Sequence, residues 1–392
     1  MANGTTGLPR TGPRILIYSH DTMGLGHLRR CRTIAHALVE QNKDLSVLII
    51  SGSPIIGSFD FKTRVDFVRV PGVIKLRNGE YTSLNLHLDI RETLAIRASI
   101  IRHTAAAFAP DMFLVDKEPL GLRDVMDDPA LLEPEWKRKN VLPALRDLYD
   151  AIWIYGLPQI CDPLTGITLP KSIKRKISYT GYLQRSVPTS LKVDPLEGFG
   201  GAPYVLVTPG GGGDGEALID WVLRAYESDA QLPHNALIVF GPFMQPELQT
   251  EFMQRIERLK RVRALTFDTR LEALMFNAAG VVAMGGYNTF CEILSFDKRA
   301  ILVPRTAPRL EQFIRAQQAQ EVGLVRMLGD DGERDVRAMI SALRDLPFQS
   351  APSEIVVPGL LDGLSNVGRL TTRWLSEKPR VLSRPRLAFA RE

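Results

Sequence analysis

The chain has 392 residues, of which 45% are apolar and 24% charged, with a formal net charge of +5. This length exceeds what one ordinary hydrophobic core serves, so two α/β domains of similar size are predicted. Three cysteines without CxxC spacing, Cys31, Cys161 and Cys291, argue against a disulfide framework or a zinc site and indicate a reducing compartment. Because the sequence has neither a signal peptide nor an apolar run of the ~18 residues that a membrane span needs, a cytoplasmic location is expected.

Short apolar runs rich in β-branched residues alternate with helix-length segments along the chain. This pattern is typical of parallel sheets covered by helices on both faces. In the first half, strands are predicted at 15–19, 45–51, 65–70, 112–115, 152–155 and 177–182. In the second half, they are predicted at 204–207, 236–240, 262–267, 281–283 and 300–303.

A segment rich in Pro and Gly, 186–202, has no hydrophobic periodicity and is interpreted as an interdomain linker. It separates an N-terminal domain at 14–185 from a C-terminal domain at 203–360. The remaining segments are a flexible N-terminus at 1–13, a helix at 361–375 and a basic tail at 376–392.

A glycine-rich turn follows the first predicted strand, with Gly24 and Gly26 directly ahead of His27. Glycine permits positive φ and close approach of a ligand, and the start of the next helix provides free N–H groups. His27 is a candidate catalytic base, because a neutral imidazole can take a proton from a hydroxyl near pH 7. His20 and Asp21, at the tip of the strand, are alternative bases, and a helix-capping role is the other interpretation of His27.

Two carboxylates, Asp116 and Glu118, follow the strand predicted at 112–115. Ligands in such sheets bind beyond the carboxyl ends of the strands, so these side chains can orient a base or hold acceptor hydroxyls. The alternative is that one of them pairs with Lys117 or Arg123.

The second half contains a run of four glycines and a later glycine pair, each after an apolar strand. The run consists of Gly210, Gly211, Gly212 and Gly213, and the pair consists of Gly285 and Gly286. Both turns can hold phosphate, because a helix follows each of them. Two turns into the later helix, the Glu292 carboxylate can accept hydrogen bonds from ribose hydroxyls or pair with a surface cation. Glu311 and Gln312 either bind sugar hydroxyls or form a solvated helix start.

This series of motifs resembles the GT-B glycosyltransferases, in particular the MurG-like branch that uses UDP-N-acetylglucosamine and has a C-terminal domain of the glycosyltransferase family 28 type. The resemblance assigns the glycine run to phosphate, and His27 behind Gly24 and Gly26 to the catalytic base. It assigns the remaining donor contacts to Phe267 beside the uracil, to the helix start with Gly286, Asn288, Thr289 and Glu292, and to Glu311 and Gln312 on the donor sugar. Glu311 replaces the Gln of that branch and Arg315 replaces its Asn, so the donor sugar is not carried over.

The resemblance implies two Rossmann-like domains whose parallel sheets face each other across a cleft. The N-terminal domain would bind a saccharide or lipid-linked acceptor, and the C-terminal domain a nucleotide sugar, expected to be a UDP-sugar. Transfer would invert the anomeric carbon, in bacterial glycan, polysaccharide or glycolipid biosynthesis. No Asp-x-Asp motif and no metal-ligand cluster occur in the sequence, so neither a metal nor a cofactor is expected.

Two other functions are considered for the same sequence. A UDP-sugar 2-epimerase shares the fold and the nucleotide-binding half, but needs no acceptor. A nucleic-acid binder is not favoured, because the basic run at 171–176 and the basic tail lack interleaved aromatic residues. That run, together with apolar and basic residues at 71–93, can instead rest on the cytoplasmic face of the inner membrane, unless the leucines pack into the core.

Overall fold

The chain divides into two compact units in a computed structural model. The structure describes residues 12–20, 26–75, 81–117, 140–186, 199, 201–211, 213–266, 268, 270–306, 310–330 and 332–377. Of these, the first unit contains the residues up to 117 together with 140–150 and 365–377, and the second contains 151–364. The contacts thus place residues 151–185 in the second unit, whereas the sequence analysis assigns them to the N-terminal domain at 14–185.

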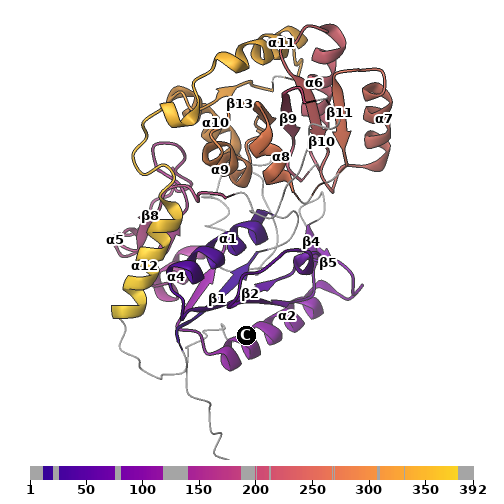
Figure 1. The fold of residues 1–392 in the computed structure, drawn as a ribbon. Coiled ribbons are helices and arrows are strands. Elements are labelled where there is room, and N and C mark those ends of the chain that lie inside the picture. Colours follow the sequence, from indigo (N-terminus) through magenta and orange to yellow (C-terminus); the bar gives the residue numbers. More distant parts are fainter. Residues whose placement is uncertain are drawn as a thin grey trace, which may run out of the picture. The chain divides into compact units, whose positions relative to one another are not determined.

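The first unit is built on a four-stranded parallel sheet in the order β3-β2-β1-β6, of which Figure 1 labels β1 and β2. Its strands are β1 (Arg14–Ser19), β2 (Ser46–Ser51), β3 (Val65–Arg69) and β6 (Met112–Val115). The sequence predicts all four with bounds that agree within one residue. Strand β1 lies between β2 and β6. The chain adds β2 and β3 on one side of β1 and then returns to add β6 on the other side. The carboxyl ends of β1 and β6 therefore form a topological switch point, where ligands bind in open α/β sheets.

Helices cover this sheet and bury its apolar side chains. This unit contains α1 (Gly26–Gln41), α2 (Ile90–Phe108), α4 (Val141–Asp147), the part of α12 (Gly363–Glu377) from residue 365 onward, and the 3-10 turn η1 (Ile56–Ser58), and α1 and α2 contact the sheet. Helix α2 packs Ile101 and Phe108 against Leu16 and Ile50 of the sheet. Helix α12 passes close to α1, since a Cβ at Gly368 would overlap the side chain of Gln41.

The connection at 71–93 contains a short antiparallel pair of strands that the sequence analysis did not predict. Strand β4 (Val73–Lys75) pairs with β5 (Tyr81–Ser83). Val73 is buried in this segment, whereas Leu86 and Leu88 are 48% and 39% exposed. The apolar side chains of the connection are thus divided between the core and the surface.

The second unit contains a six-stranded parallel sheet in the order β11-β10-β9-β12-β13-β14. Its strands are β9 (Tyr204–Thr208), β10 (Asn235–Val239), β11 (Val262–Leu265), β12 (Gly280–Ala283), β13 (Ala300–Leu302) and β14 (Arg326–Met327). This is the strand order of the doubly wound dinucleotide-binding fold, with its switch point between β9 and β12. The sequence predicts all of these strands except β14, whose two residues are too short for a recognisable pattern.

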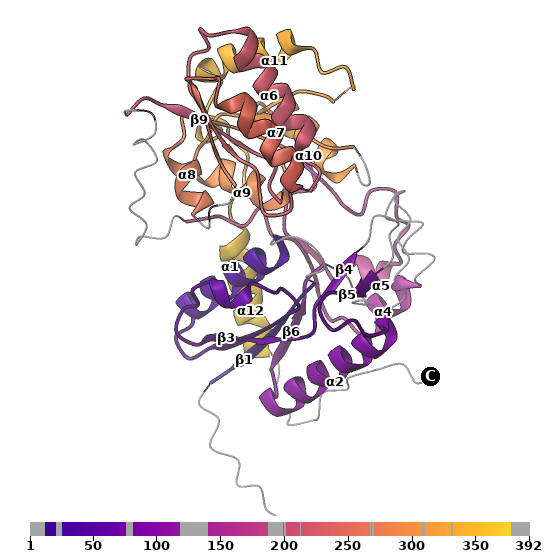
Figure 2. The same ribbon diagram turned by 90° about the vertical axis from the view of Figure 1, so that its right-hand side faces the viewer.

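Helices cover both faces of this sheet, and Figure 2 labels members of both sets. One face is covered by α6 (Glu216–Ser228), α7 (Pro246–Ile256) and α11 (Val336–Asp345), and the other by α8 (Leu271–Asn277), α9 (Tyr287–Ser295) and α10 (Glu311–Glu321). Alternate residues of β9 enter the two cores, Val205 and Val207 on one side and Tyr204 and Leu206 on the other. Burial on both faces explains why the strand is apolar at every position but the last.

A small parallel pair of strands, β7 (Ile152–Ile154) and β8 (Ile177–Tyr179), belongs to the second unit. The basic run at 171–176 contains the one-turn helix α5 (Lys171–Lys174), in which Ile173 is buried and both lysines are exposed. Two further 3-10 turns, η3 (Leu346–Phe348) and η4 (Pro352–Glu354), follow α11.

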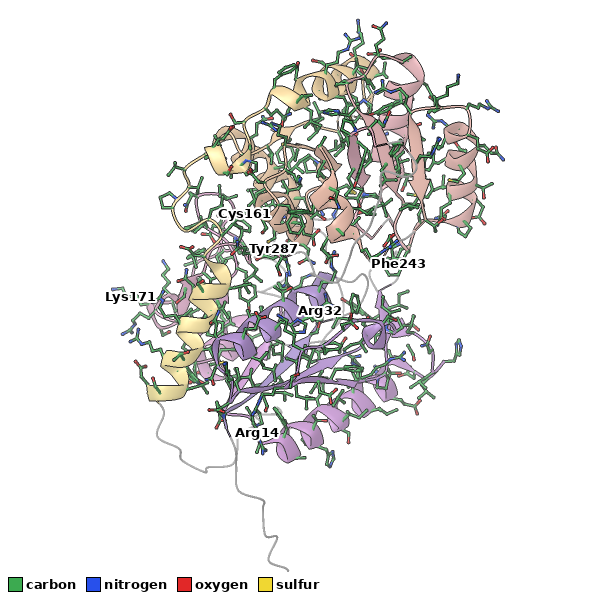
Figure 3. All side chains as sticks on the ribbon, viewed as in Figure 1. Arg14, Arg32, Cys161, Lys171, Phe243 and Tyr287 are labelled. Atoms are coloured by element: carbon green, nitrogen blue, oxygen red, sulfur yellow. The ribbon has the colours of Figure 1, made fainter. Side chains whose placement is uncertain are left out.

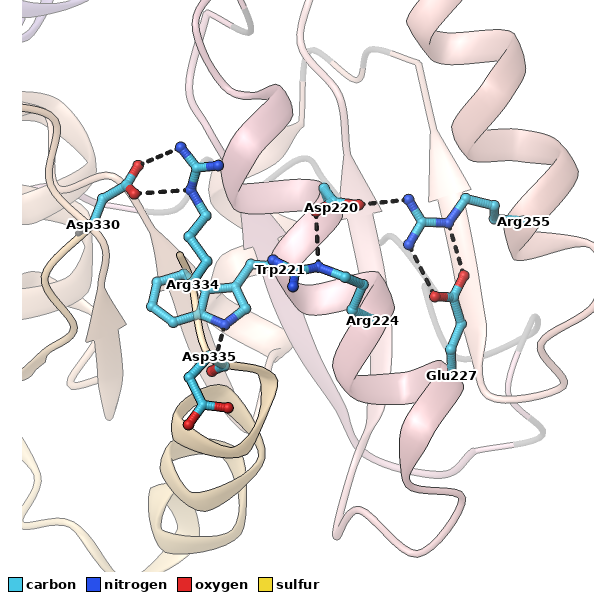
Figure 4. Close-up of polar contacts among 8 residues, drawn as sticks. All are labelled: Asp220, Trp221, Arg224, Glu227, Arg255, Asp330, Arg334 and Asp335. Atoms are coloured by element: carbon cyan, nitrogen blue, oxygen red, sulfur yellow. Dashed lines mark hydrogen bonds and ion pairs between the residues drawn. The ribbon is translucent and has the colours of Figure 1, made fainter. Parts of the chain in front are cut away.

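Ion pairs lie on the outer surface of α6 and α7 in the second unit (Figure 4). Arg255 binds both Asp220 and Glu227, at 2.8 Å and 2.7 Å. The Trp221 indole N–H donates to the Asp335 carbonyl at 2.9 Å and connects α6 to the start of α11. Because solvent-exposed pairs contribute only about 0–1 kcal/mol each, the packing of these helices depends mainly on the apolar core.

Candidate active site

A histidine, a carboxylate and an arginine meet at the switch point of the first unit. His27 lies in the first turn of α1, and Asp116 directly follows β6. The two meet with His27 Nδ1 2.5 Å from Asp116 Oδ2. Arg30, one helical turn after His27, donates from Nε to Asp116 Oδ1 at 2.8 Å and from Nη2 to Oδ2 at 2.7 Å. The structure thus brings together His27 and Asp116, which are 89 residues apart in sequence.

The charge of Asp116 determines which nitrogen of His27 carries the proton. Burial raises the pKa of the Asp116 carboxyl, but the charges and hydrogen bonds of Arg30 and His27 outweigh burial and hold this pKa well below its usual range. An ionised carboxylate only accepts hydrogen bonds, so Nδ1 of His27 donates, and in the neutral tautomer of the ring the lone pair is therefore on Nε2. Arg30 Nη2 lies 2.9 Å from Nδ1 because both donors share Oδ2.

The second histidine, His20, lies beside His27 but in a different environment. Its ring stands edge-on to that of His27, with 6.0 Å between the centroids. His20 is 4% exposed, and burial together with the charge of Lys117 lowers its pKa to about 3. A base that does not take up a proton near neutral pH is poorly suited to general base catalysis. The environment therefore favours His27 over His20, and Asp21, Gly24 and Glu118 lie outside the described residues.

In the second unit the two glycine turns are neighbours, because β9 and β12 pair up to Thr208 and Ala283 at their carboxyl ends. Gly210 has φ +83° and donates its N–H to Thr208 Oγ1 at 3.2 Å. At Gly241 a Cβ would lie 2.6 Å from the Gly210 carbonyl oxygen, so this close approach requires glycine.

An exposed aromatic ring covers part of the glycine run. Phe243, labelled in Figure 3, is 44% exposed, and its backbone N–H donates to the Gly211 carbonyl at 3.0 Å. A Cβ at Gly211 would lie 3.4 Å from the Phe243 ring, and one at Gly213 would lie 3.9 Å from its Cβ. Sequence reasoning missed Phe243, because it belongs to the loop after β10. Gly212 and Phe267 lie outside the described residues.

Helix α9 begins directly after the second glycine pair. Gly285 has φ +75°, and Gly286 occupies the N-cap position without a side-chain cap. Asn288 accepts from Arg185 Nη2 at 2.6 Å, and Thr289 is 9% exposed. Glu292 is 1% exposed, which excludes its alternative interpretation as a solvated surface ion pair.

The predicted pair on α10 separates into one exposed and one buried side chain. Glu311 is exposed, whereas Gln312 is 8% exposed. Gln312 Nε2 lies 4.0 Å from the position of a Cβ on Gly286, and its buried Oε1 has no hydrogen-bond partner among the described residues. Gln312 therefore contacts the turn that precedes α9.

Sequence reasoning also missed the part that Arg30 plays, although its spacing of three residues from His27 on one helix was a usable signal. Within the described parts of the chain, no group of three or more His, Cys, Asp or Glu side chains is arranged to hold a metal ion.

Comparison with known proteins identifies the class. Residues 205–351 match the model of the glycosyltransferase family 28 C-terminal domain. An uncharacterized glycosyltransferase of Methanosarcina acetivorans is 22% identical over 384 residues, which cover 91% of this chain and 97% of that protein.

Among solved structures, the calicheamicin glycosyltransferase CalG4 aligns with a TM-score of 0.54 and 16% identity, over 93% of this chain and 99% of its own. A UDP-N-acetylglucosamine 2-epimerase aligns with a TM-score of 0.59 and 13% identity, over 94% and 98%. At these identities the structural matches establish the fold alone, and they confirm the predicted α/β architecture with two Rossmann-like parallel sheets. The chain has the GT-B fold, and it is a glycosyltransferase with a family 28 C-terminal domain at residues 205–351.

Proposed function

We propose that the protein transfers a sugar from a UDP-sugar to a hydroxyl acceptor, and that the second unit binds the donor. The observation that carries this proposal is the pair of adjacent glycine turns at the β9–β12 switch point, where α9 begins without a side-chain cap. A helix start of this kind favours phosphate, because the N–H groups of a helix's first turn point away from the helix and its dipole is positive there. Two structural neighbours support a uridine nucleotide, one in complex with UDP and one with UDP-2-fluoro-glucose.

In the proposed reaction His27 takes the proton of the acceptor hydroxyl through Nε2. The acceptor oxygen bonds to the anomeric carbon as the bond to the diphosphate oxygen breaks, so a single displacement inverts this carbon and releases UDP. Asp116 holds the imidazole in the required tautomer and stabilises the imidazolium that forms. Backbone N–H groups of the glycine run and of α9 stabilise the leaving diphosphate. We propose that the reaction needs neither metal nor cofactor, because these N–H groups supply the stabilisation of the leaving group.

The acceptor is proposed to be a saccharide or a lipid-linked sugar of bacterial glycan or glycolipid biosynthesis, as in the MurG-like branch. None of the helices described here combines the length and apolarity that a membrane crossing requires. A cytoplasmic enzyme that rests on the inner membrane is part of the proposal, and the exposed Leu86 and Leu88 support it. Sedimentation with anionic liposomes at low salt should pellet the protein, and recovery in the supernatant at every salt concentration would favour a soluble acceptor.

The transferase reaction is tested by incubating the protein with UDP-sugars, alone and with candidate acceptors. Glycosyl transfer predicts a glycosylated product and UDP only when an acceptor is present. The 2-epimerase alternative, which has the same fold, predicts an epimerised UDP-sugar without any acceptor. Formation of that epimer by the acceptor-free protein would overturn the proposal.

A further inference from the structure

One buried cation near the α9 turn is not used by the reaction as described. Arg315, on α10, is 6% exposed, and no carboxylate of the described residues lies within ion-pair distance of it, although the charge of Glu311, one helical turn earlier, favours its cationic form. An unpaired charge in the protein interior is costly, so its retention calls for a compensating partner. In this chain Arg315 replaces the Asn of the MurG-like branch, which makes it a feature of this sequence.

The contacts of Arg315 place it behind the turn that opens α9. Its Nη1 donates to the Gly285 carbonyl at 3.0 Å, and the Tyr182 hydroxyl lies close enough to act on its charge. The guanidinium carbon lies 5.8 Å from the ring centroid of Tyr287, which is labelled in Figure 3, and 6.0 Å from that of Phe290. Carbonyl, hydroxyl and aromatic groups surround the cation, and Glu311 acts on it without forming an ion pair, so its charge is only partly compensated.

A second unsatisfied buried group, on α10, lies beside the turn that opens α9. Gln312 lies one helical turn before Arg315, and its Oε1 is buried without a hydrogen-bond partner among the described residues. Arg315 Nε is in the same condition. Two such atoms beside one uncapped helix start indicate that a polar ligand completes this region.

We propose that Arg315 is a positioning residue of the donor diphosphate subsite. It fixes the Gly285 turn and supplies a buried positive charge that the bound diphosphate compensates. The inference rests on the proposed UDP-sugar donor. The charge acts in the same direction as the α9 dipole, and solvent screens it less than a surface arginine because it is buried.

The test is a calorimetric titration of the full-length protein with uridine, UMP and UDP at low and high salt. Arg315→Met should weaken UDP ~10- to 50-fold and UMP less, and leave uridine within about twofold, because only the phosphates interact with the charge. Arg315→Lys should retain most of the preference for UDP over uridine. The control is Arg326→Met, which removes an arginine of the same unit that pairs with Asp345; all three affinities should stay at the wild-type value.

The ratio of UDP affinity to uridine affinity separates the possible outcomes. An equal loss for all three ligands, or an unchanged ratio in a folded variant, would overturn the role of the charge. If Arg315→Met does not fold, Arg315→Gln decides by the same ratio, since an amide can still donate to the Gly285 carbonyl without a charge. Failure of the wild-type protein to bind UDP would overturn the proposed donor instead.

Discussion

Asp116 Oδ2 lies 2.5 Å from Nδ1 of His27, and Arg30 binds the same carboxylate through two nitrogens. The carboxylate follows the last residue of β6, and the histidine lies in the helix that follows β1. Because β1 and β6 are adjacent parallel strands, their carboxyl ends bring both side chains to one edge of the sheet. The carboxylate thereby selects the tautomer of the neutral imidazole that has its proton on Nδ1 and its lone pair on Nε2.

Asp116→Asn should lower kcat by ~100- to 10,000-fold, because an amide no longer enforces the Nδ1-protonated tautomer. UDP affinity should not change, since the proposed UDP site is built from the second unit. Steady-state kinetics and calorimetry on the same preparation check both values. A kcat within threefold of wild type would contradict the role of Asp116.

His20 should make stability depend on pH below neutrality. Its pKa is lowered to about 3 in the folded protein, so the unfolded chain takes up a proton near pH 6.5 that the folded chain does not. The stability from this group is therefore present above pH 6.5 and is lost progressively as the pH falls toward the folded value.

The matched variant is His20→Gln, which cannot titrate. Between pH 7 and pH 5 the wild type should lose about 1–2 kcal/mol more of its free energy of unfolding than the variant. Urea denaturation at both pH values measures this difference, and parallel losses would contradict it.

UDP should bind and stabilise the protein without divalent metal. Ligands that prefer the native state raise the melting temperature, so UDP should raise it equally in EDTA and in magnesium. Differential scanning fluorimetry compares UDP with ADP, GDP and CDP. A stabilisation that EDTA abolishes, or an equal response to every nucleotide, would contradict the proposed donor.

Glu292→Gln should weaken UDP by about 1.5–3 kcal/mol through loss of charge-assisted bonds to the ribose. The wild type should also prefer UDP over 2′-deoxy-UDP, and the variant should lose most of that preference. Calorimetric titration with both nucleotides gives the two ratios. A variant that keeps the wild-type preference would show that Glu292 does not bind the ribose.

Gln312→Ala should reduce turnover of the UDP-sugar about tenfold or more and leave UDP affinity nearly intact, because the amide is proposed to bind the sugar. Glu311→Ala provides a matched comparison on the same helix turn, from an exposed side chain. Equal losses of UDP and UDP-sugar binding in Gln312→Ala would assign this residue to the nucleotide or to the turn itself.

The sequence by itself determined the elements whose signals are local. The run Tyr204–Val207 is apolar at every position because both faces of β9 are buried, and this continuous pattern identifies a central parallel strand. Gly210 and Gly285 identify turns because both need positive φ. The β4–β5 pair and β14 lack such signals, since strands of two or three residues depend on pairing with distant partners.

Only the tertiary structure decided which residues act together. In sequence His20 is an alternative base to His27, but in the structure burial keeps His20 neutral while Asp116, 89 residues from His27, orients the His27 ring. Arg315 differs from a solvated arginine only through its position against the Gly285 carbonyl. Strand order decides these contacts, because it determines which loops share an edge of the sheet, and burial then sets the charge of each side chain.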